Sequence, residues 1–211
     1  GYLMYNITLV CTHHSDFGKC NSDELYNIIE LVRPDVIFEE LNHDLFDKFY
    51  KENEIPNEPP EVKAVKKYIK DNNISHIPVD INVSDTLSID EIKYLFKALC
   101  KYTVYSKLKD EQKRLAFQEG YDFLNSKKNE ELVEEMKSLE KNLIAFQINK
   151  DQLSRIHGVF YEEQNNREYE IVKNVYDYSG RIEYNQALLL LGSGHRKSIF
   201  EKIKNYESES H

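Results

Sequence analysis

The strongest constraint on the fold is a strand, helix and strand pattern near the start of the chain. A β-branched run at Ile7–Val10 is followed by a polar stretch, by a helical pattern that Asn21 can cap, and by a second buried run at Asp35–Phe38. Glu24 lies three residues after the cap, where its side chain can bond back to the backbone, and Pro34 ends the helix. Three such elements within roughly 35 residues form a βαβ unit, whose crossover joins parallel strands. The sequence therefore predicts a parallel sheet.

Two more strands and two more helices extend this pattern. A helix is predicted over Glu61–Lys70, a third strand over Ile74–Val79, and a last strand over Gln186–Leu191, which contains four consecutive leucines. A glycine turn follows the last strand, and a final helix runs through Ile199 and Ile203. We expect an α/β fold with an open, mainly parallel sheet that is flanked by helices.

Between the third and last strands lies a long charged segment, 88–178, which is predicted to be a helix-rich insertion. It begins with a capping box at Ser88–Glu91 and is interrupted near Gly120 and at Asn125–Ser126. Apolar residues recur in this segment at helical spacing, which indicates packed helices. They are Leu95, Leu99, Tyr102, Leu132, Met136, Leu139, Leu143 and Phe146. The whole chain, 1–211, is expected to form one domain that carries this insertion.

Composition narrows the classes of function. The net charge of −9 argues against nucleic acid as a partner, since that binding needs a basic surface. No apolar run approaches the roughly 20 residues that cross a bilayer, and no secretory signal is visible, so no membrane partner is expected. The three cysteines lack the spacing of a disulfide framework, and we expect a cytoplasmic protein. Gly1–Leu3 precede Met4, so the start of the chain says nothing about localisation.

Four residues that can bind or catalyse follow the predicted strands. His14 follows the first strand and Glu40 the second. Asp80 follows the third strand and His195 the last. In open α/β sheets, ligands bind outside the carboxyl ends of the strands. These side chains are therefore predicted to share one cleft.

The first motif, Cys11–Asp16, places a thiol, two imidazoles, hydroxyls and a carboxylate within six residues. An imidazole here can act as a general base near neutral pH or bind a metal through a neutral nitrogen. The alternative is a polar loop with surface histidines. A zinc pair of Cys11 and His14 lacks a second set of Cys or His ligands, so structural zinc is not expected.

Two carboxylates, Glu39 and Glu40, stand at the exit of the second strand. Side chains alternate along a strand, so the two are expected on opposite sides. One of them must lie near the interior, where burial raises its pKa unless a cation or metal balances it. We assign Glu40 to the site and Glu39 to capping of the next helix. His43 is expected on the surface of that helix.

The second motif, Gly192–Ser198, is a glycine turn between a buried strand and a helix. Its backbone amides can hold an anion. It is not a Walker A loop, because no glycine precedes Lys197, and the same lysine breaks the dinucleotide-binding fingerprint. His195 is therefore the residue of this motif that we assign to the site. The alternative interpretation is that this histidine only caps the helix.

Arg167 lies in a polar, helical segment before the last strand. It can clamp a carboxylate, a phosphate or an oxyanion in bidentate fashion. The alternative is a solvated charge partner on its own helix. Asp80 can orient a histidine or bind a metal, or it can simply begin a loop.

The order of these motifs resembles that of the TraB/TIKI family. The matching stretches are Cys11–His14, Arg33–Leu41, Asn166–Tyr169 and Leu191–His195, at the two ends of the chain. The wider group includes the erythromycin esterases and the ChaN haem-binding lipoproteins. Cys11 stands where the first glycine is expected, and Asp80 is followed by isoleucine where the family pattern has arginine.

The resemblance implies an α/β core in which two histidines, a glutamate and an arginine face one cleft. By position these are His14, Glu40, Arg167 and His195. TIKI members are described as metal-dependent proteases, and the esterase branch as hydrolases in which a histidine activates water. TraB-type members have signalling or inhibitor-binding roles, and ChaN binds haem iron.

We expect a hydrolase of amide or ester bonds that acts on a small-molecule or peptide substrate. His14, Glu40 and His195 either bind one divalent metal ion (Mn, Co or Zn) or jointly activate a water. Without metal, one histidine is the base and Glu40 orients it. Arg167 or the amides of the glycine turn would stabilise the oxyanion. The alternative is a non-enzymatic ligand-binding or signalling module that uses the same cleft for a peptide, an anion or haem.

Overall fold

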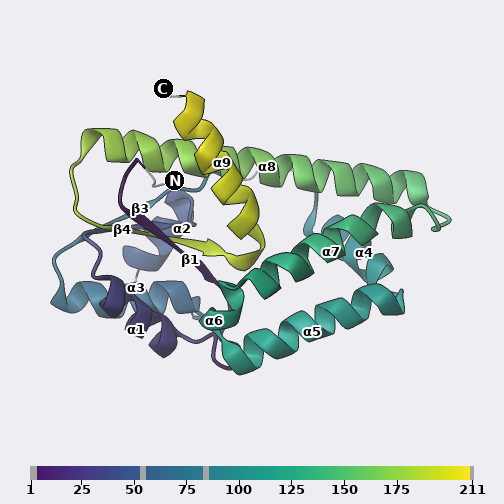
Figure 1. The fold of residues 1–211 in the computed structure, drawn as a ribbon, viewed down its shortest axis with the longest axis horizontal. Coiled ribbons are helices and arrows are strands. Elements are labelled where there is room, and N and C mark those ends of the chain that lie inside the picture. The colour runs from purple at the N-terminus through teal and green to yellow at the C-terminus, as the bar shows by residue number, and fades with distance from the viewer. Residues whose placement is uncertain (1–3, 53–55, 83–85, 210–211) are drawn as a thin grey trace.

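The computed structural model describes residues 4–52, 56–82 and 86–209, so Gly1–Leu3 lie outside the described residues. Its centre is a sheet of four parallel strands in the order β1-β4-β2-β3. Helices cover both faces of this sheet (Figure 1). The strands are β1 (Ile7–Thr12), β2 (Val36–Glu39), β3 (Ser75–Pro78) and β4 (Ala187–Gly192). The predicted α/β class with a parallel sheet is confirmed.

The two strands that precede the histidine motifs lie side by side. β1 pairs with β4 from Ile7 opposite Ala187 to Thr12 opposite Gly192. The polar stretch expected from Cys11 begins only after Thr12, because the ladder to β4 continues through both residues. This register brings the carboxyl ends of the two strands, and the motifs that follow them, to the same edge of the sheet.

Two separate cores pack on the two faces of the sheet. One contains buried residues of α1 (Ser22–Val32) and α3 (Pro60–Asp71), which lie below the strands in Figure 1. The other contains residues from the second half of α8 (Lys150–Arg181) and from α9 (Arg196–Glu209), above the strands. The four leucines of β4 are buried and alternate between these cores. A strand buried on both faces needs such a continuous apolar run.

The first crossover helix begins and ends where the sequence predicts. The side chain of Asn21 accepts a hydrogen bond from the Glu24 N–H, which satisfies one of the free donors at the start of α1. Arg33 ends the helix in the left-handed region, with a φ of 51°, just before Pro34. The chain then passes directly into β2.

The insertion forms an arm that extends to the right of the sheet in Figure 1. Helix breaks fall at Gly120 and at Asn125–Ser126, as predicted, and the capping box between Ser88 and Glu91 is present. The arm has its own core of buried residues from four helices. It comprises α4 (Ile89–Cys100), α5 (Thr103–Glu119), α6 (Tyr121–Leu124), α7 (Lys127–Ile144) and the first half of α8.

The expectation that Phe146 packs inward is wrong. α7 ends at Ile144, and Phe146 is 79% exposed in the turn before α8, where Ile148 is fully exposed. The Phe146 N–H bonds to the carbonyl of Leu143, three residues back. This tighter turn departs from the helical period, so Phe146 leaves the apolar stripe on which its spacing placed it.

The long helix α8 joins the arm to the sheet. Its first half contributes Leu153 and Ile156 to the core of the arm, and its second half contributes Ile171 and Val175 to the core against the sheet. Arg167 lies between these two stretches. One rigid element therefore fixes the position of this arginine relative to both parts of the molecule.

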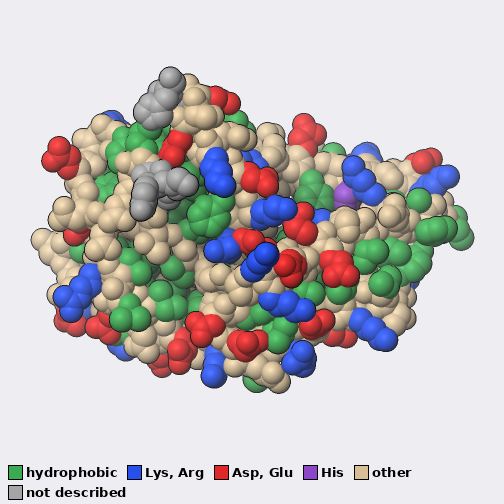
Figure 2. Space-filling view, viewed as in Figure 1, with side chains coloured by type: hydrophobic (Ala, Val, Ile, Leu, Met, Phe, Trp, Pro, Cys, Tyr) green, Lys and Arg blue, Asp and Glu red, His purple; other side chains and the backbone are tan. Residues whose placement is uncertain are grey.

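The surface mixes charges of both signs. Acidic and basic side chains are interspersed over the face shown in Figure 2, and hydrophobic side chains gather at the far end of the arm on its right. Within the described residues, no helix combines the length and the apolar character required to span a bilayer.

The exposed edge of β1 is closed by a side chain from the arm. Asn125, just after α6, accepts a hydrogen bond from the Cys11 N–H at 2.7 Å and donates one to the Cys11 carbonyl at 3.0 Å. The amide thus takes the place of a neighbouring strand at this buried residue. Because a buried backbone group without a partner is costly, this contact ties the arm to the strand that leads to His14.

We predict that Asn125→Ala lowers the free energy of unfolding by about 1–3 kcal/mol, since it leaves both backbone groups of Cys11 without their partner. Urea unfolding followed by circular dichroism measures this. Asn142→Ala, at an exposed position of α7, is the matched control and should change the value by less than about 0.5 kcal/mol. Equal effects of the two substitutions would contradict the assigned role of Asn125.

Candidate functional site

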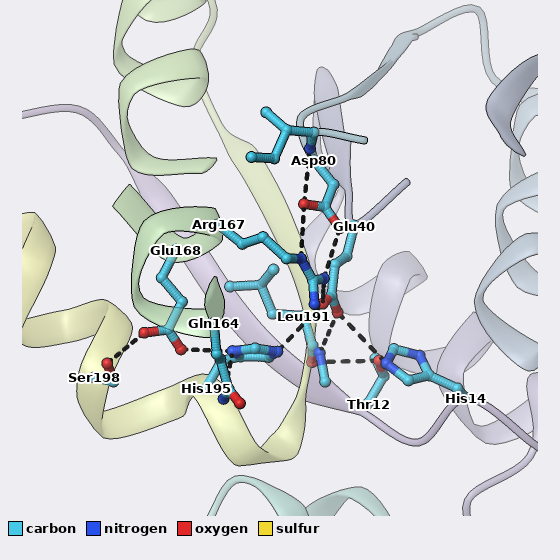
Figure 3. Close-up of polar contacts among 12 residues, drawn as sticks. Thr12, His14, Glu40, Asp80, Gln164, Arg167, Glu168, Leu191, His195 and Ser198 are labelled. Carbon is cyan, nitrogen blue, oxygen red and sulfur yellow. Dashed lines mark hydrogen bonds and ion pairs between the residues drawn. The ribbon is translucent and has the colours of Figure 1, made fainter. Parts of the chain in front are cut away.

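The carboxyl edge of the sheet carries a connected network of charged side chains (Figure 3). His14, Glu40 and Asp80 follow β1, β2 and β3, and His195 lies in the short 3-10 turn after β4. Arg167 reaches this edge from α8. The structure thus brings together every residue that the sequence placed in the site.

Glu40 is the centre of the network. Its side chain is only 8% exposed. Oε1 accepts the Gly192 N–H at 2.8 Å and lies 3.5 Å from His14 Nε2. Oε2 accepts a hydrogen bond from Arg167 Nη2 at 3.0 Å and lies 3.3 Å from His195 Nε2. Residues separated by more than 150 positions in the chain therefore meet at one carboxylate.

His14 is held from behind by a carboxylate of α3. Its Nδ1 lies 2.6 Å from Oε2 of Glu61, and Thr12 donates to the same oxygen at 3.2 Å. The other nitrogen, Nε2, points toward Glu40 and Gly192, and the ring remains 60% exposed. A carboxylate on Nδ1 fixes the ring and favours the tautomer with a free Nε2, which is how a histidine is prepared to act as a base.

Gly192 is required by this packing. A Cβ at that position would lie 2.8 Å from His14 Nε2 and 3.5 Å from Glu40 Oε1. Any side chain there would displace the His14 ring. The first glycine of the second motif is therefore explained by a close approach between the two motifs.

His195 is held by a second carboxylate, Glu168 of α8. Its Nδ1 lies 2.6 Å from Glu168 Oε2, and the other oxygen of Glu168 accepts hydrogen bonds from Ser198 and from Lys202 at 2.9 Å. His195 is buried, unlike His14. Figure 3 shows its ring between Glu168 and Glu40, so both ring nitrogens face carboxylates.

Arg167 links the ends of β2 and β3. Asp80 accepts from Nε at 3.2 Å and from Nη2 at 2.7 Å, and Nη2 also donates to Glu40. Asp80 thus positions the arginine and contacts neither histidine. In the part of the chain that the structure describes, Nη1 of Arg167 has no protein hydrogen-bond partner. Arg167 also lines the site pocket, so its guanidinium is placed to contact a ligand there.

The surrounding carboxylates raise the pKa of both histidines. Burial alone would lower the pKa of His195, but the hydrogen bonds to Glu168 and Glu40 raise it to about 9. The pKa of His14 is also raised, first by the hydrogen bond to Glu61. Burial raises the pKa of Glu40, but the two histidines and the Gly192 amide outweigh burial and lower it to about 2. At neutral pH Glu40 is therefore ionised and His195 is an imidazolium.

A pocket of about 390 Å³ opens beside this network. Its lining includes five charged side chains, those of His14, Glu40, Glu61, Asp80 and Arg167. It also includes apolar residues, among them Leu41, Leu45, Phe49, Pro59, Val62 and Ile81. His195 is not part of the lining, so it acts on a ligand only through Glu40. A larger depression, about 980 Å³, lies at the amino ends of the strands and contains no predicted site residue.

Two expectations about neighbouring residues are corrected. Cys11 is a buried strand residue whose thiol pKa is raised to about 12 by burial, so it is neither part of a turn nor a thiolate ligand. Glu39 does not cap α2 (His43–Tyr50), because Asn42 does so. Glu39 is buried instead and accepts hydrogen bonds from Tyr50 and His76, although burial still raises its pKa. His43 is exposed, as expected.

The sequence pattern does not single out Glu61 and Glu168, the two carboxylates that hold the histidines. For Glu61 a signal exists, since it lies in the first turn of α3, and a helix that follows a parallel strand begins near the carboxyl edge of the sheet. For Glu168 the only signal is its position next to Arg167 in the middle of a long helix. Its partner, His195, is 27 positions away.

The expected metal ligands do not fit a single ion in this arrangement. A zinc-like ion needs its donor atoms about 2.0–2.2 Å from one point. His14 and His195 instead approach different oxygens of Glu40 from opposite sides, and Arg167 already bonds to one of them (Figure 3). Over residues 4–52, 56–82 and 86–209, no group of three or more His, Cys, Asp or Glu side chains is arranged to hold a metal.

We predict that the free energy of unfolding falls as the pH rises from about 6.5 to about 9. The pKa of His195 is raised in the folded state from 6.5 to about 9. The stability that its protonation contributes is therefore complete below the lower value and is lost through the higher one. Urea unfolding at several pH values measures this, and a histidine NMR titration locates the pKa.

Glu168→Gln removes one of the charges that raise the pKa of His195, so the decline should move to lower pH. His43→Gln, at an exposed position, should leave the pH profile unchanged. A wild-type profile that is flat between these pH values would contradict the assignment.

Comparison with known proteins does not identify a family for this chain. No protein-family model, no curated protein and no solved structure matches the chain. The resemblance to the TraB/TIKI family therefore rests on the motifs alone, and the function must be argued from the site.

Proposed function

We propose that the protein is a hydrolase of ester or amide bonds, with His14 as the general base. The observation that carries this proposal is the geometry of His14, whose Nδ1 is held by Glu61 and whose exposed ring lines the pocket. An imidazole that is oriented by a carboxylate and lies beside a pocket supplies the parts that activate a water or hydroxyl. The resemblance to the TraB/TIKI group supports the same class of reaction.

The reaction would proceed in two proton transfers. His14 Nε2 takes a proton from a water in the pocket, and the water oxygen attacks the carbonyl carbon of the substrate. The carbonyl oxygen becomes an oxyanion, which the guanidinium of Arg167 stabilises. When the bond to the leaving group breaks, the protonated His14 gives its proton to the departing alcohol or amine. The products are a carboxylic acid and that alcohol or amine.

Two contacts support other assignments within this proposal than the sequence suggested. The short contact between Glu61 and His14 Nδ1 supports Glu61, rather than Glu40, as the carboxylate that orients the base. The Gly192 amide already donates to Glu40, so it is not free for the oxyanion. Glu40 holds Arg167 and the two histidines at fixed distances, and His195 keeps Glu40 ionised.

The apolar part of the pocket lining indicates the nature of the substrate. Leu45, Phe49 and Val62 line the same pocket as the charged side chains. Burial of a Leu- or Phe-sized group against such a lining contributes about 1.5–3 kcal/mol to binding. We propose a small-molecule or peptide substrate with an apolar group next to the scissile carbonyl. Three unpaired cysteines support the cytoplasm as its compartment.

We predict that His14→Ala lowers kcat/KM about 10²–10⁴-fold, the usual contribution of a general base. Hydrolysis is measured on a panel of p-nitrophenyl esters of increasing chain length and of internally quenched peptides. His13→Ala removes the neighbouring imidazole, which does not reach the network, and is the control. Absence of hydrolysis across both panels would overturn the proposal that the protein is an enzyme. It would favour the alternative, a ligand-binding or signalling module.

We also predict that kcat/KM rises with pH through the pKa of His14, which lies above 6.5, because the base must be unprotonated. Glu61→Gln removes the hydrogen bond that raises this pKa, so the rise should move to lower pH while the rate falls. Asp71→Asn, an exposed acid at the other end of α3, should leave the profile in place. An unchanged profile in Glu61→Gln would contradict the role of Glu61.

The same assay decides the part played by a divalent ion. Hydrolysis that persists after treatment with EDTA supports the route through His14 and Glu61. Activity lost with EDTA and restored by Mn²⁺, Co²⁺ or Zn²⁺ would overturn the metal-free route and would favour the metal-dependent hydrolase that the motifs resemble.

A further inference from the structure

A second pocket, of about 250 Å³, lies between the arm and the turn that carries His195. Helices α4, α5, α7 and α8 each contribute to its lining, and Ser193 and Gly194 close its remaining side. It shares no lining residue with the site pocket. It is therefore a separate cavity on the other side of the second histidine motif.

Positively charged side chains outnumber negatively charged ones in the lining of this pocket. Lys109 lies with its ammonium 4.9 Å from the centre of the Phe96 ring, and Lys137 lies 5.7 Å from that of Tyr161. Neither lysine has a carboxylate within ion-pair distance among the described residues. A single cation–π contact does not occupy all three N–H donors of an ammonium group, so both lysines can still bind an anion.

The one acid in the lining already has hydrogen-bond partners on both of its oxygens. Glu140 is buried and accepts hydrogen bonds from the hydroxyls of Tyr105 and Tyr161, while His157 lies 3.0 Å from it. Both oxygens are engaged, so this carboxylate does not need the lysines as partners. Its contacts also fix the two tyrosine rings as walls of the pocket.

The rest of the lining is apolar or amide. Phe96, Val133 and Met136 provide an apolar surface, and Gln112 and Gln164 provide side-chain amides. An apolar surface with a few convergent polar groups is typical of a small-molecule site. We infer that this pocket binds a small organic anion with an apolar body, whose acidic group lies between Lys109 and Lys137.

The pocket is also connected to the network around Glu40. Nε2 of Gln164 lies 3.4 Å from Nδ1 of His195, and Ser193 and Gly194 directly precede that histidine. A bound ligand would therefore touch residues that hold His195, while His14 lies in the other pocket. This difference gives an experimental signal for where a ligand binds.

The test compares 4-phenylbutyrate with the neutral 4-phenylbutanol by isothermal titration calorimetry on the full chain. The acid should bind at least about tenfold more tightly than the alcohol, because hydrogen bonds between charged groups are stronger than those to a neutral hydroxyl. In a Lys109→Met/Lys137→Met variant the acid should bind no more tightly than the alcohol. Methionine keeps an apolar stem of similar length, so packing against the rings is retained.

Lys113→Met/Lys141→Met is the matched control, since these exposed lysines lie on the same two helices outside the pocket. It should leave the affinity for the acid unchanged. The Lys109→Arg/Lys137→Arg variant keeps both charges and should retain the preference for the acid. Equal affinity for acid and alcohol in the wild-type protein, or an equal loss in the control, would overturn the proposal.

NMR locates the ligand independently of any activity. Saturating 4-phenylbutyrate should shift the amide signals of Ser193 and Gly194 and the imidazole signals of His195, and should leave those of His14 in place. Shifts confined to His14 would place the ligand in the site pocket and would contradict a second site.

Discussion

The buried charge of Glu40 is the interaction on which the rest of the site depends. A carboxylate in this position would be strongly disfavoured without compensation. The compensation comes from three directions: the Gly192 amide on β4, Arg167 on α8, and the two histidines after β1 and β4. Each of these groups reaches Glu40 only if its own element is in place. The correct packing of both halves of the chain is thus a condition for satisfying one negative charge.

Both histidines contact Glu40, but they differ in exposure. His195 lies buried between two carboxylates and remains protonated, so it serves as a fixed cation. His14 also lies between two carboxylates, Glu61 and Glu40, but its ring is exposed beside the pocket. Two motifs with the same spacing therefore carry unequal roles, and only His14 is suited to exchange a proton with a substrate. A symmetric metal pair would require both rings to face one point.

Helix α8 connects the chemistry to the arm. Its consecutive residues Arg167 and Glu168 hold the networks around Glu40 and His195, and Gln164, one turn earlier, reaches the second pocket. Asn125 makes a second connection, because it closes the edge of β1 just before His14. The arm therefore contributes to the position of both histidine motifs, and a ligand held in the arm is within contact distance of the residues around His195.

The sequence by itself determined the parallel sheet, the helix caps and the edge at which the site lies. These follow from local patterns. Apolar runs predict the strands, and Asn21 and Ser88 mark the starts of two helices. The ends of the strands place His14, Glu40, Asp80 and His195 at one edge of the sheet. Only the tertiary structure decided which carboxylate meets which histidine. Glu61 and Glu168 are 47 and 27 positions from their partners, and no local pattern encodes such a pairing. The burial of Glu39 and the exposure of Phe146 were decided in the same way, because both depend on how separate elements pack and where a helix ends.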